Sequence, residues 1–315
     1  MSMSKLSVLT ITPNPAVDKS ASVDGIQPEK KLHCTLPLFQ AGGGGINVAR
    51  VLNRLGAKVT AAFPCGGYTG ELLKDLLTAE KVQTMPIASE NWVRENLAVT
   101  DSYTNRQYRF GMPGGKLRSA EWKNLLNVIT KLEPSPNIIV GSGSLPPGVP
   151  IDFYAQLAKI SKLKEIKFIL DTNDQALQSA LEEGVFMIKP NLRELAILSG
   201  KDALEGSEPE VFARSLVLTG KAQIVVVSMG AHGALLVSDT LTLHAAPPPV
   251  HRISTIGAGD SMVAGMTHKI LQQKPYSEVL QFGVACGTAA TLSKGTGLCR
   301  PEIAQKIHQW MIGNQ

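Results

Sequence analysis

Cysteine is scarce in this sequence: there are four in 315 residues, and no two of them form a C-x-x-C pair. They stand far apart along the chain, at Cys34, Cys65, Cys286 and Cys299. Disulfide-stapled domains and zinc sites need several cysteines at characteristic close spacings. The cysteine pattern therefore predicts neither a disulfide framework nor a zinc knuckle.

Long apolar runs are missing too. Runs such as Ile224–Val227 have the length of a strand, whereas a membrane-spanning helix needs roughly 20 apolar residues. The N-terminal segment MSMSKLSVLTIT leads into a strand-like pattern without the basic region and long apolar stretch of a secretory signal. We therefore expect no transmembrane helix, no secretory signal, no membrane partner and a cytoplasmic location.

Aromatic residues make up only 5% of the chain, and Lys and Arg are scattered among acidic residues without forming a basic run. Proteins that bind nucleic acid usually combine clustered positive charge with aromatic side chains that stack on bases. We therefore expect no nucleic-acid partner. The modest net charge of +5 suits an enzyme whose cleft attracts small anionic substrates.

Strand-like and helix-like patterns alternate along most of the chain, of which 43% is hydrophobic. The pattern Ile46–Leu55 has apolar residues at helical spacing and stops at Gly56. Short apolar runs predict strands at Ser7–Thr12, Lys58–Phe63, Asn137–Gly141, Lys167–Asp171, Phe186–Lys189 and Ile224–Met229. Further helices are predicted at Gly259–Gln272, Ser277–Leu292 and Pro301–Met311. This order predicts an α/β fold with a mostly parallel sheet covered by helices on both faces.

Two stretches interrupt this pattern, Ala21–Phe39 and Leu97–Met112. Both contain short, partly alternating strand candidates broken by polar residues, so they predict a small sheet away from the core. Two interpretations stay open from the pattern alone. The small sheet is either a lid that closes over a functional site or a set of surface hairpins without that role.

A glycine turn opens the helix pattern at Ser254–Ser261, whose sequence is STIGAGDS. Its glycines let the backbone approach a ligand, and the free N–H groups of the first helical turn can face an anion such as phosphate. Asp260 lies in that first turn. Its carboxylate either favours the helix dipole, which is the commoner role at this position, or accepts a proton from a hydroxyl beside the anion.

A second glycine run, Ala41–Asn47, also precedes a helix pattern. Four glycines can be a flexible linker, but the flanking strand and helix patterns favour a close backbone approach to a polar ligand, with Asn47 as a hydrogen-bonding amide. A third loop, Gly141–Gly148, follows a predicted strand, where ligands of parallel sheets bind. Neither G-x-G-x-x-G nor G-x-x-x-x-G-K-[ST] occurs, so any nucleotide needs another phosphate cradle.

The segment Lys189–Glu194 closes a predicted strand and enters a helix pattern. It places a lysine, an amide and a carboxylate near the same edge of the sheet. Taken alone, an ordinary helix cap explains the segment better than a ligand site does.

These motifs occur together and in one order. The chain resembles the ribokinase-like carbohydrate kinases, in particular their PfkB branch, in TPNPAVD, GGGGINVARVLNRLG, SGSLPPG, KPNLREL, VVVSMGAHGA and STIGAGDSMVAG. The resemblance covers essentially the whole chain. Within the branch, EKKLHCTLPLFQAGGGGIN, WVRENL, QYRFGMPG and GVACGTAATLSKGT look closest to the minor 6-phosphofructokinases of enteric bacteria.

The resemblance implies a ribokinase-like three-layer α/β/α domain over residues 1–315, interrupted by segments of a small β-sheet lid at about 19–40 and 95–112. It implies an ATP-dependent 6-phosphofructokinase of glycolysis, which converts fructose 6-phosphate to fructose 1,6-bisphosphate. ATP is then the co-substrate and Mg²⁺ the metal cofactor. Because the lids of this family commonly pair between subunits, the resemblance also implies a homodimer.

The resemblance assigns roles to single residues. It makes Asp260 the catalytic base, beside an anion hole formed by the N–H groups of Gly257, Ala258 and Gly259. The substrate-binding residues that it implies are Asp18, Lys31, Gly43, Gly44, Asn47, Arg94 and Ser142. The nucleotide end is implied at Lys189, Asn191, Ser228, Gly230 and Gly233, with Glu194 acting on Mg²⁺ through water.

The resemblance also implies a site for a monovalent cation, K⁺, near the anion hole. Its residues are Ser254, Ile256, Ala290, Ser293 and Gly295. Gly297 departs from the family pattern, which has an arginine there, so the details of this loop stay open.

Three alternatives remain at this point. 1-Phosphofructokinase and tagatose-6-phosphate kinase share every motif above. A non-catalytic sugar-phosphate sensor belongs to a different class, and the intact GAGD segment argues against it. A nicotinamide-dependent Rossmann enzyme is disfavoured by the missing glycine fingerprint.

Overall fold

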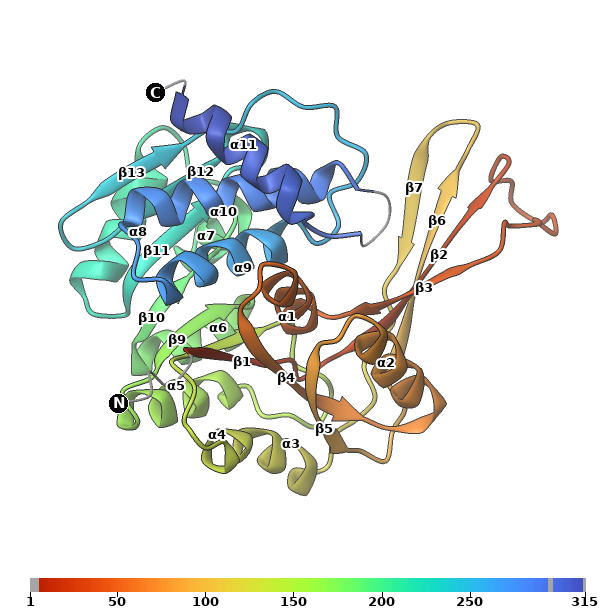
Figure 1. Ribbon diagram of the computed structural model, residues 1–315, viewed down its shortest axis with the longest axis horizontal. Helices are drawn as coiled ribbons and strands as arrows, with labels where there is room; N and C mark the ends of the chain where they lie inside the picture. Colours follow the sequence, from red (N-terminus) through yellow and green to blue (C-terminus); the bar gives the residue numbers. More distant parts are fainter. Residues whose placement is uncertain (1–5, 294–296, 314–315) are drawn as a thin grey trace.

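The computed structural model describes residues 6–293 and 297–313. In this part of the chain, nine strands form one large sheet (Figure 1). In spatial order they are β13 (Thr242–Ala245), β12 (Ala234–Val237), β11 (Ala222–Ser228), β10 (Val185–Ile188), β9 (Lys167–Asp171), β8 (Ile138–Ser142), β1 (Ser7–Ile11), β4 (Lys58–Cys65) and β5 (Gln83–Ala88). Neighbouring strands from β11 to β5 are parallel, and β12 pairs antiparallel with both of its neighbours.

Helices cover both faces of this sheet, because its central strands carry apolar side chains on both faces and both faces must be shielded from water. One hydrophobic core lies under α1 (Gly44–Arg54), α2 (Gly67–Ala79), α9 (Ala258–Leu271), α10 (Tyr276–Thr291) and α11 (Pro301–Gly313). The other lies under α3 (Ser119–Leu126), α4 (Val128–Lys131), α5 (Phe153–Leu163), α6 (Asp174–Glu183), α7 (Leu192–Leu198) and α8 (Glu208–Leu218). The predicted three-layer α/β/α fold is therefore confirmed.

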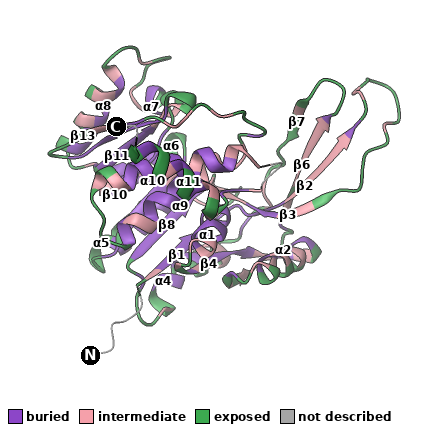
Figure 2. Ribbon diagram, turned by 45° about the horizontal axis from the view of Figure 1, so that its top comes forward, coloured by how far each residue is buried: buried purple, intermediate pink, exposed green. Residues whose placement is uncertain are grey.

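A separate four-stranded sheet projects from this body (Figure 1). Its order is β3 (Leu38–Gly42), β2 (Ala16–Val23), β6 (Arg94–Asp101) and β7 (Arg106–Phe110). Figure 2 shows that its strands are mostly half-buried or exposed, whereas the central strands of the large sheet are mostly buried. The predicted small sheet is confirmed, although β2 begins at Ala16, a few residues before the expected segment.

Three strands of the large sheet escaped the sequence prediction, namely β5, β12 and β13. β5 and β13 are edge strands in which most residues are at least partly exposed. Edge strands of this kind need no continuous apolar run, so their sequence pattern is weak. Among the described residues, no helix is both long and apolar enough to cross a membrane.

Candidate active site

Side chains from four neighbouring strands meet at one edge of the large sheet. Ser142 ends β8, Asp171 ends β9, Lys189 directly follows β10, and Ser228 ends β11. Because these strands are parallel, their carboxyl ends lie at the same edge, which is where ligands bind in open α/β sheets. The predicted loops after β8, β10 and β11 therefore come together.

The glycine turn before α9 lies at this edge. Gly257 caps the helix in the left-handed region, with φ of 70°, and a Cβ there would also overlap Leu298. The first N–H groups of a helix have no acceptor inside the helix and can face an anion. A Cβ on Gly259 would lie 3.5 Å from Lys189 Nζ, so this ammonium group adds a full positive charge beside the turn. The Ala258 N–H is partly engaged, since it donates a long 3.4 Å hydrogen bond to the Thr255 carbonyl.

Asp260 lies in the first turn of α9 and contacts α1. Its Oδ2 accepts a 2.9 Å hydrogen bond from Asn47 Nδ2. Burial, reinforced by the negative charge of Asp171, raises the pKa of Asp260 to about 7, against the lowering effects of the Asn47 hydrogen bond and Lys189. A carboxyl group with this pKa changes protonation near neutral pH, as a general base must.

Arg50 orients Asn47, and the sequence analysis did not single it out. Its guanidinium is 2% exposed and donates to Asn47 Oδ1 at 3.3 Å, to the Ala41 carbonyl at 2.6 Å and to Glu80 at 2.8 Å. Because the amide oxygen of Asn47 is held by a cation, its NH₂ group is the side that faces Asp260. A charged residue within the apolar pattern of the predicted helix was the only sequence signal for this role.

Asp171 is a second residue that the sequence analysis missed. Its Oδ1 lies 3.3 Å from Lys189 Nζ, and Lys189 is buried. Burial lowers the pKa of Lys189, but the carboxylates of Asp171, Glu194 and Asp260 outweigh it, so the net shift is upward and the ammonium stays charged. A carboxylate at the end of a predicted parallel strand was the available signal for Asp171.

Asn191 and Glu194 form a reciprocal cap at the start of α7. Asn191 Oδ1 accepts from the Glu194 N–H at 2.9 Å, and Glu194 Oε2 accepts from the Asn191 N–H at 2.9 Å. The cap interpretation from sequence is thus correct for the local structure. Burial raises the pKa of Glu194, while the Asn191 hydrogen bond and Lys189 oppose that rise. The cap holds this carboxylate close enough to Lys189 for the two charges to interact.

A cavity of about 250 Å³, here called the lid cavity, lies between the small sheet and the α9 turn. Its lining includes Asp18, Arg94, Asn96, Arg109 and Ile256. Asp18 Oδ1 accepts a 2.9 Å hydrogen bond from Asn96 Nδ2. Burial raises the pKa of Asp18, although Asn96 and the positive charge of Arg94 act in the opposite direction.

Arg94 is held by backbone carbonyls at the base of the small sheet. It donates to the Met112 carbonyl at 3.0 Å and to the Asn14 carbonyl at 3.2 Å. Its Nε is buried and has no hydrogen-bond partner among the described residues. A guanidinium that is positioned by neutral carbonyls, with Asp18 as a nearby opposite charge, can still bind an anion.

Arg109 joins the small sheet to the glycine turn, and the sequence analysis did not identify it. From β7 its Nη2 donates a 3.3 Å hydrogen bond to Thr255 Oγ1. Thr255 lines a second cavity, whereas its neighbour Ile256 lines the lid cavity. The sequence pattern placed Arg109 in a strand of the small sheet and gave no signal that its side chain reaches the glycine turn.

This second cavity, here called the loop cavity, has a volume of about 520 Å³. It lies on the other side of the turn, and its lining includes Ser228, Gly230, Gly233, Thr255 and Gly259. The segment Thr255–Gly259 thus borders both cavities, and Asp260 follows it directly. A group transferred from one cavity to the other passes this turn.

The glycine run before α1 is tightly packed and is not a linker. Gly43 has φ of 105°, and a Cβ there would press against Thr12 and Pro15. A Cβ on Gly44 would overlap Ser142 Oγ, so this glycine lets α1 approach the end of β8. Close packing is therefore a sufficient structural reason for both glycines, alongside any contact with a ligand.

Comparison with known proteins identifies the family. The model of the pfkB family carbohydrate kinases matches residues 3–303. The chain belongs to the PfkB family. It is 42% identical over 305 residues to the ATP-dependent 6-phosphofructokinase isozyme 2 of Escherichia coli, covering 96% of this chain and 98% of that protein. The same isozyme from Mycobacterium tuberculosis is 38% identical over 304 residues, covering 96% and 89% of the two chains.

Solved structures agree with this PfkB assignment. Phosphofructokinase-2 from Escherichia coli, in complex with substrates and products, has a TM-score of 0.93 and 41% identity, covering 98% of this chain and 99% of that chain. A structure of the same protein in complex with potassium also has a TM-score of 0.93 and 41% identity, covering 98% of this chain and all of that chain. The predicted resemblance to the PfkB branch is confirmed.

Lys31 lies apart from the other residues that the sequence predicted to bind substrate in this PfkB chain. It is exposed in the segment between β2 and β3, and the lining of the lid cavity does not include it. The other predicted substrate-binding residues lie at or next to the glycine run, the lid cavity and the end of β8. Within this chain, the structure does not bring Lys31 to them.

The predicted cation residues flank the start of α9 and the end of α10. The Ser254 N–H donates to the Thr291 carbonyl at 3.2 Å, directly after Ala290. Ser293 Oγ donates to the Leu298 carbonyl at 3.1 Å, and Ile256 lines the lid cavity. Gly295 lies outside the described residues. Gly297 does lie within them, and its carbonyl accepts a 2.8 Å hydrogen bond from Arg54 Nη1.

Proposed function

We propose that this PfkB chain is an ATP-dependent 6-phosphofructokinase, which transfers the γ-phosphoryl group of ATP to a hydroxyl of fructose 6-phosphate. The observation that carries the proposal is the pairing of two cavities across the turn that holds Asp260. The lid cavity contains two arginines, Arg94 and Arg109, which suit an acceptor that already carries a phosphate. The full-length similarity to curated 6-phosphofructokinases supports the same substrate.

In the proposed reaction Asp260 is the base. Its carboxylate takes the proton of the acceptor hydroxyl while the hydroxyl oxygen forms a bond to the γ-phosphorus and the bond to the ADP oxygen breaks. Asn47 holds the carboxylate at 2.9 Å, and Asp18 is a hydrogen-bond acceptor for another sugar hydroxyl. Burial keeps the pKa of Asp260 near neutrality, so the proton is accepted readily.

The turn and Lys189 stabilise the transferring group. Negative charge spreads over the phosphoryl oxygens in the transition state, and fixed donors placed there stabilise it more than they stabilise bound ATP. We assign this role to the free N–H groups of the turn at Gly257 and Gly259, together with the Lys189 ammonium. Ser228, Gly230 and Gly233 line the loop cavity, where we place the nucleotide, with Asn191 at its edge.

Mg²⁺ fits the carboxylates beside Lys189. Among the described residues, no cluster of three or more His, Cys, Asp or Glu side chains forms a ready-made metal cage. This agrees with the usual behaviour of Mg²⁺, which keeps several waters and binds through one or two carboxylates and the substrate phosphates. We propose that Asp171 and Glu194 hold it in this way, and that Mg²⁺ neutralises charge on the nucleotide phosphates.

The substitution Glu194→Gln tests the metal role. Gln can still accept the N–H of Asn191 through its side-chain oxygen, so the cap of α7 is kept. The Mg²⁺ concentration needed for half-maximal activity should rise several-fold, because a carboxylate is lost. An unchanged Mg²⁺ requirement would remove Glu194 from the metal site.

A panel of phosphorylated acceptors tests the proposed function. Fructose 6-phosphate, fructose 1-phosphate and tagatose 6-phosphate are each supplied with ATP and Mg²⁺, and ADP release is followed. Fructose 6-phosphate should have the highest kcat/KM. A preference for fructose 1-phosphate or tagatose 6-phosphate would make the chain a sister kinase, and no ADP release with any acceptor would indicate a sugar-phosphate sensor.

We further propose one domain over residues 1–315, in which the small sheet is an inserted lid that pairs in a homodimer. The lid exposes apolar side chains, among them Leu36 at 94%, Leu38 at 56% and Phe110 at 49%. An exposed apolar patch of this kind is a typical subunit interface. In such a dimer, Lys31 can bind substrate only in the partner's site, to which the lid would carry it. Light scattering at working concentration should give a dimer, and a monomer would contradict the proposal.

K⁺ is proposed as a monovalent cofactor near Ser254, Ile256, Ala290 and Ser293. The support is the similar structure described in complex with potassium. Activity in KCl should exceed activity in an equal concentration of tetramethylammonium chloride, and equal activities would contradict a cation site. The cytoplasmic location and the absence of a nucleic-acid partner stay predictions from the sequence.

A further inference from the structure

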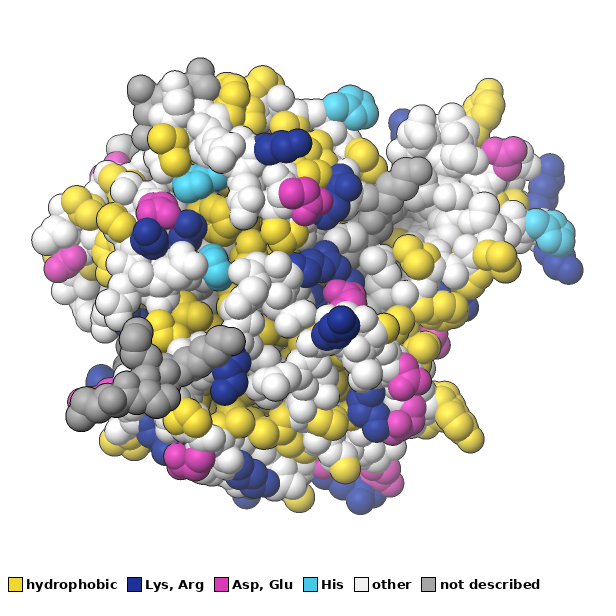
Figure 3. All heavy atoms as spheres, viewed as in Figure 1, with side chains coloured by type: hydrophobic (Ala, Val, Ile, Leu, Met, Phe, Trp, Pro, Cys, Tyr) yellow, Lys and Arg dark blue, Asp and Glu magenta, His cyan; other side chains and the backbone are white. Residues whose placement is uncertain are grey.

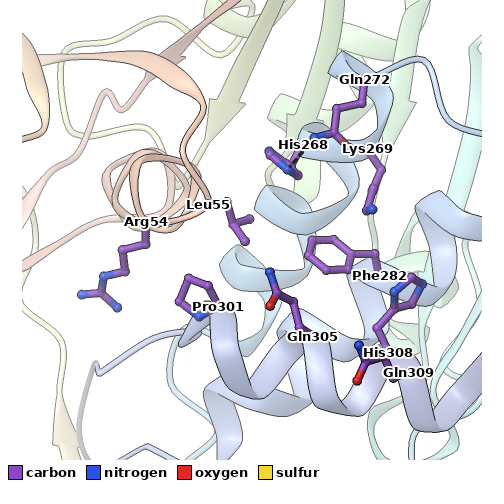
Figure 4. A pocket seen from close by; sticks show the side chains of 10 residues that line it. All are labelled: Arg54, Leu55, His268, Lys269, Gln272, Phe282, Pro301, Gln305, His308 and Gln309. Atoms are coloured by element: carbon purple, nitrogen blue, oxygen red, sulfur yellow. Dashed lines mark hydrogen bonds between the residues drawn. The ribbon is translucent and has the colours of Figure 1, made fainter.

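A third cavity lies away from the lid and loop cavities, at the C-terminal ends of α1 and α9 (Figure 4). Its volume is about 330 Å³, which lies within the range of roughly 300–1,000 Å³ that is typical of small-molecule sites. We call it the distal cavity. Figure 4 shows side chains from α1, α9, α10 and α11 that surround it. The proposed reaction uses none of these side chains.

Two histidine rings in the distal cavity have buried nitrogens without partners. His268 Nδ1 and His308 Nε2 make no hydrogen bond with any described residue. The Phe282 ring lies near both, with ring centroids 6.1 Å from His268 and 5.3 Å from His308. A buried polar atom without a partner destabilises a fold, and such atoms are few in native proteins. Neither nitrogen has accessible surface in this conformation, so a bound molecule removes that cost only when a ring turns its nitrogen toward the cavity.

The charges in the distal cavity favour an anion. Its lining contains the cations Arg54 and Lys269 and no carboxylate. The carboxylates that pair with these cations, Glu80 and Glu278, are not part of the lining. Figure 3 shows histidine, Lys or Arg, and some Asp or Glu side chains together over α9, α10 and α11 on this face. A cavity lined by one sign of charge attracts ligands of the opposite sign.

The distal cavity also has an apolar floor. Leu55, Phe282 and Pro301 contribute carbon surface, and Figure 4 shows Lys269 from α9 and Gln305 from α11 on opposite sides of the Phe282 ring. The Lys269 ammonium lies 4.6 Å from the centroid of that ring and donates to Glu278 Oε1 at 2.6 Å. Its remaining hydrogens can bind an anionic group, while the apolar floor accommodates a carbon skeleton.

We propose that the distal cavity is an effector site for a small organic anion, a carboxylate or phosphate ester of a few carbon atoms. Lys269 binds the anionic group, the imidazoles of His268 and His308 donate through their ring N–H groups, and Gln305 contacts the polar remainder. The inorganic phosphate ion shares this chemistry but lacks the carbon skeleton, so it binds more weakly than an organic anion.

The distal cavity is connected to the active site by two helices. Asn47 and Asp260, near the N-terminal ends of α1 and α9, are joined by a hydrogen bond, and Arg54 and Lys269, near the C-terminal ends, line the distal cavity. Arg54 also donates to the carbonyl of Gly297, in the loop proposed for K⁺. An anion bound at the ends of both helices is therefore placed to act on the Asn47–Asp260 contact through them.

The test is an NMR titration of the two imidazoles in the full-length protein. Inorganic phosphate, 3-phosphoglycerate and citrate are added separately, with fructose 6-phosphate and a non-hydrolysable ATP analogue occupying the active site. At least one organic anion should give saturable shifts of His268 and His308 with a single Kd, tighter than that of phosphate. Burial and the charge of Lys269 lower the pKa of both rings, so a bound anion should raise these pKa values.

Substitutions locate the binding. Lys269→Met keeps an apolar stem over Phe282 and should weaken anion binding at least about tenfold, the loss expected for one charge-assisted hydrogen bond. Lys274→Met is the matched control, because Lys274 lies 3.9 Å from the same Glu278 but does not line the cavity. It should bind like the wild-type protein. Gln305→Leu, which removes no charge, should weaken binding without disturbing the ion pairs of Glu278.

Three outcomes would overturn the proposal. The first is the absence of saturable shifts with every anion, and the second is unchanged binding in both Lys269→Met and Gln305→Leu. The third is equal weakening in Lys269→Met and Lys274→Met, which would indicate general screening of charge and not a site. Because this readout is binding, it does not depend on which sugar phosphate the enzyme uses.

Discussion

The Asn47 amide donates a 2.9 Å hydrogen bond to Asp260, although 213 residues separate the two in the chain. It joins the first turn of α9 to the start of α1, so the glycine run and the glycine turn share one hydrogen-bond network. Arg50 extends this network by donating to the amide oxygen of Asn47. The proposed base is thereby oriented from the acceptor side of the site.

Replacement of Asp260 tests its role as the base. Asp260→Asn should lower kcat by roughly 10²- to 10⁴-fold, the usual effect of losing a positioned general base. Asn still offers a side-chain oxygen to the Asn47 amide, so the KM values and the circular dichroism spectrum should change little. Turnover close to that of the wild-type enzyme would show that another group takes the proton.

The same variant should be more stable than the wild-type protein at pH 8. Burial raises the pKa of Asp260 from 3.8 in the unfolded chain to about 7 in the folded protein. Between these two values the folded state retains a proton that the unfolded state has lost, so the carboxyl group progressively destabilises the fold as pH rises through this window. Denaturant unfolding should therefore show a larger advantage of Asp260→Asn at pH 8 than at pH 5. An advantage that does not grow with pH would contradict the raised pKa.

Arg94 should affect the binding of the phosphorylated acceptor and not the binding of ATP. In Arg94→Ala the KM for fructose 6-phosphate should rise about 10- to 100-fold, as expected for the loss of a hydrogen bond between charged groups, while the KM for ATP stays nearly constant. The control is Arg106→Ala, because Arg106 is exposed on β7 and does not line the lid cavity. Steady-state kinetics with each substrate varied in turn make the measurement. Equal weakening of both substrates would remove Arg94 from the acceptor site.

Arg109 and Thr255 should act as a pair. Their 3.3 Å hydrogen bond is a direct side-chain contact between the lid and the glycine turn, so Arg109→Ala and Thr255→Val should each lower kcat/KM for fructose 6-phosphate. In the double variant the effects should be clearly less than additive, as contacting residues usually show. Gln107→Ala is the control, because it removes another hydrogen-bond partner of Arg109 and leaves Thr255 in place. Additive effects would show that the contact is incidental.

The sequence alone determined the layered fold and most of the loops around the site. Helix and strand periodicity are local properties, so the pattern Ile46–Leu55 predicted α1 (Gly44–Arg54), and the run Lys167–Asp171 predicted β9 with the same bounds. The glycine turn before Asp260 could be identified for the same reason, because a helix start depends on neighbouring residues. The family motifs then supplied candidate roles that periodicity could not.

Only the tertiary structure decided which side chains meet. Asp171 and Lys189 come from successive strands, and Arg109 reaches Thr255 from the other sheet. A local sequence pattern therefore predicts neither contact. The same holds for Lys31, which motif similarity placed in the site and which the fold leaves exposed between β2 and β3. The physical reason is that such contacts depend on strand order and helix packing. These are set by burial of the two apolar faces of the sheet, summed over residues far apart in the chain.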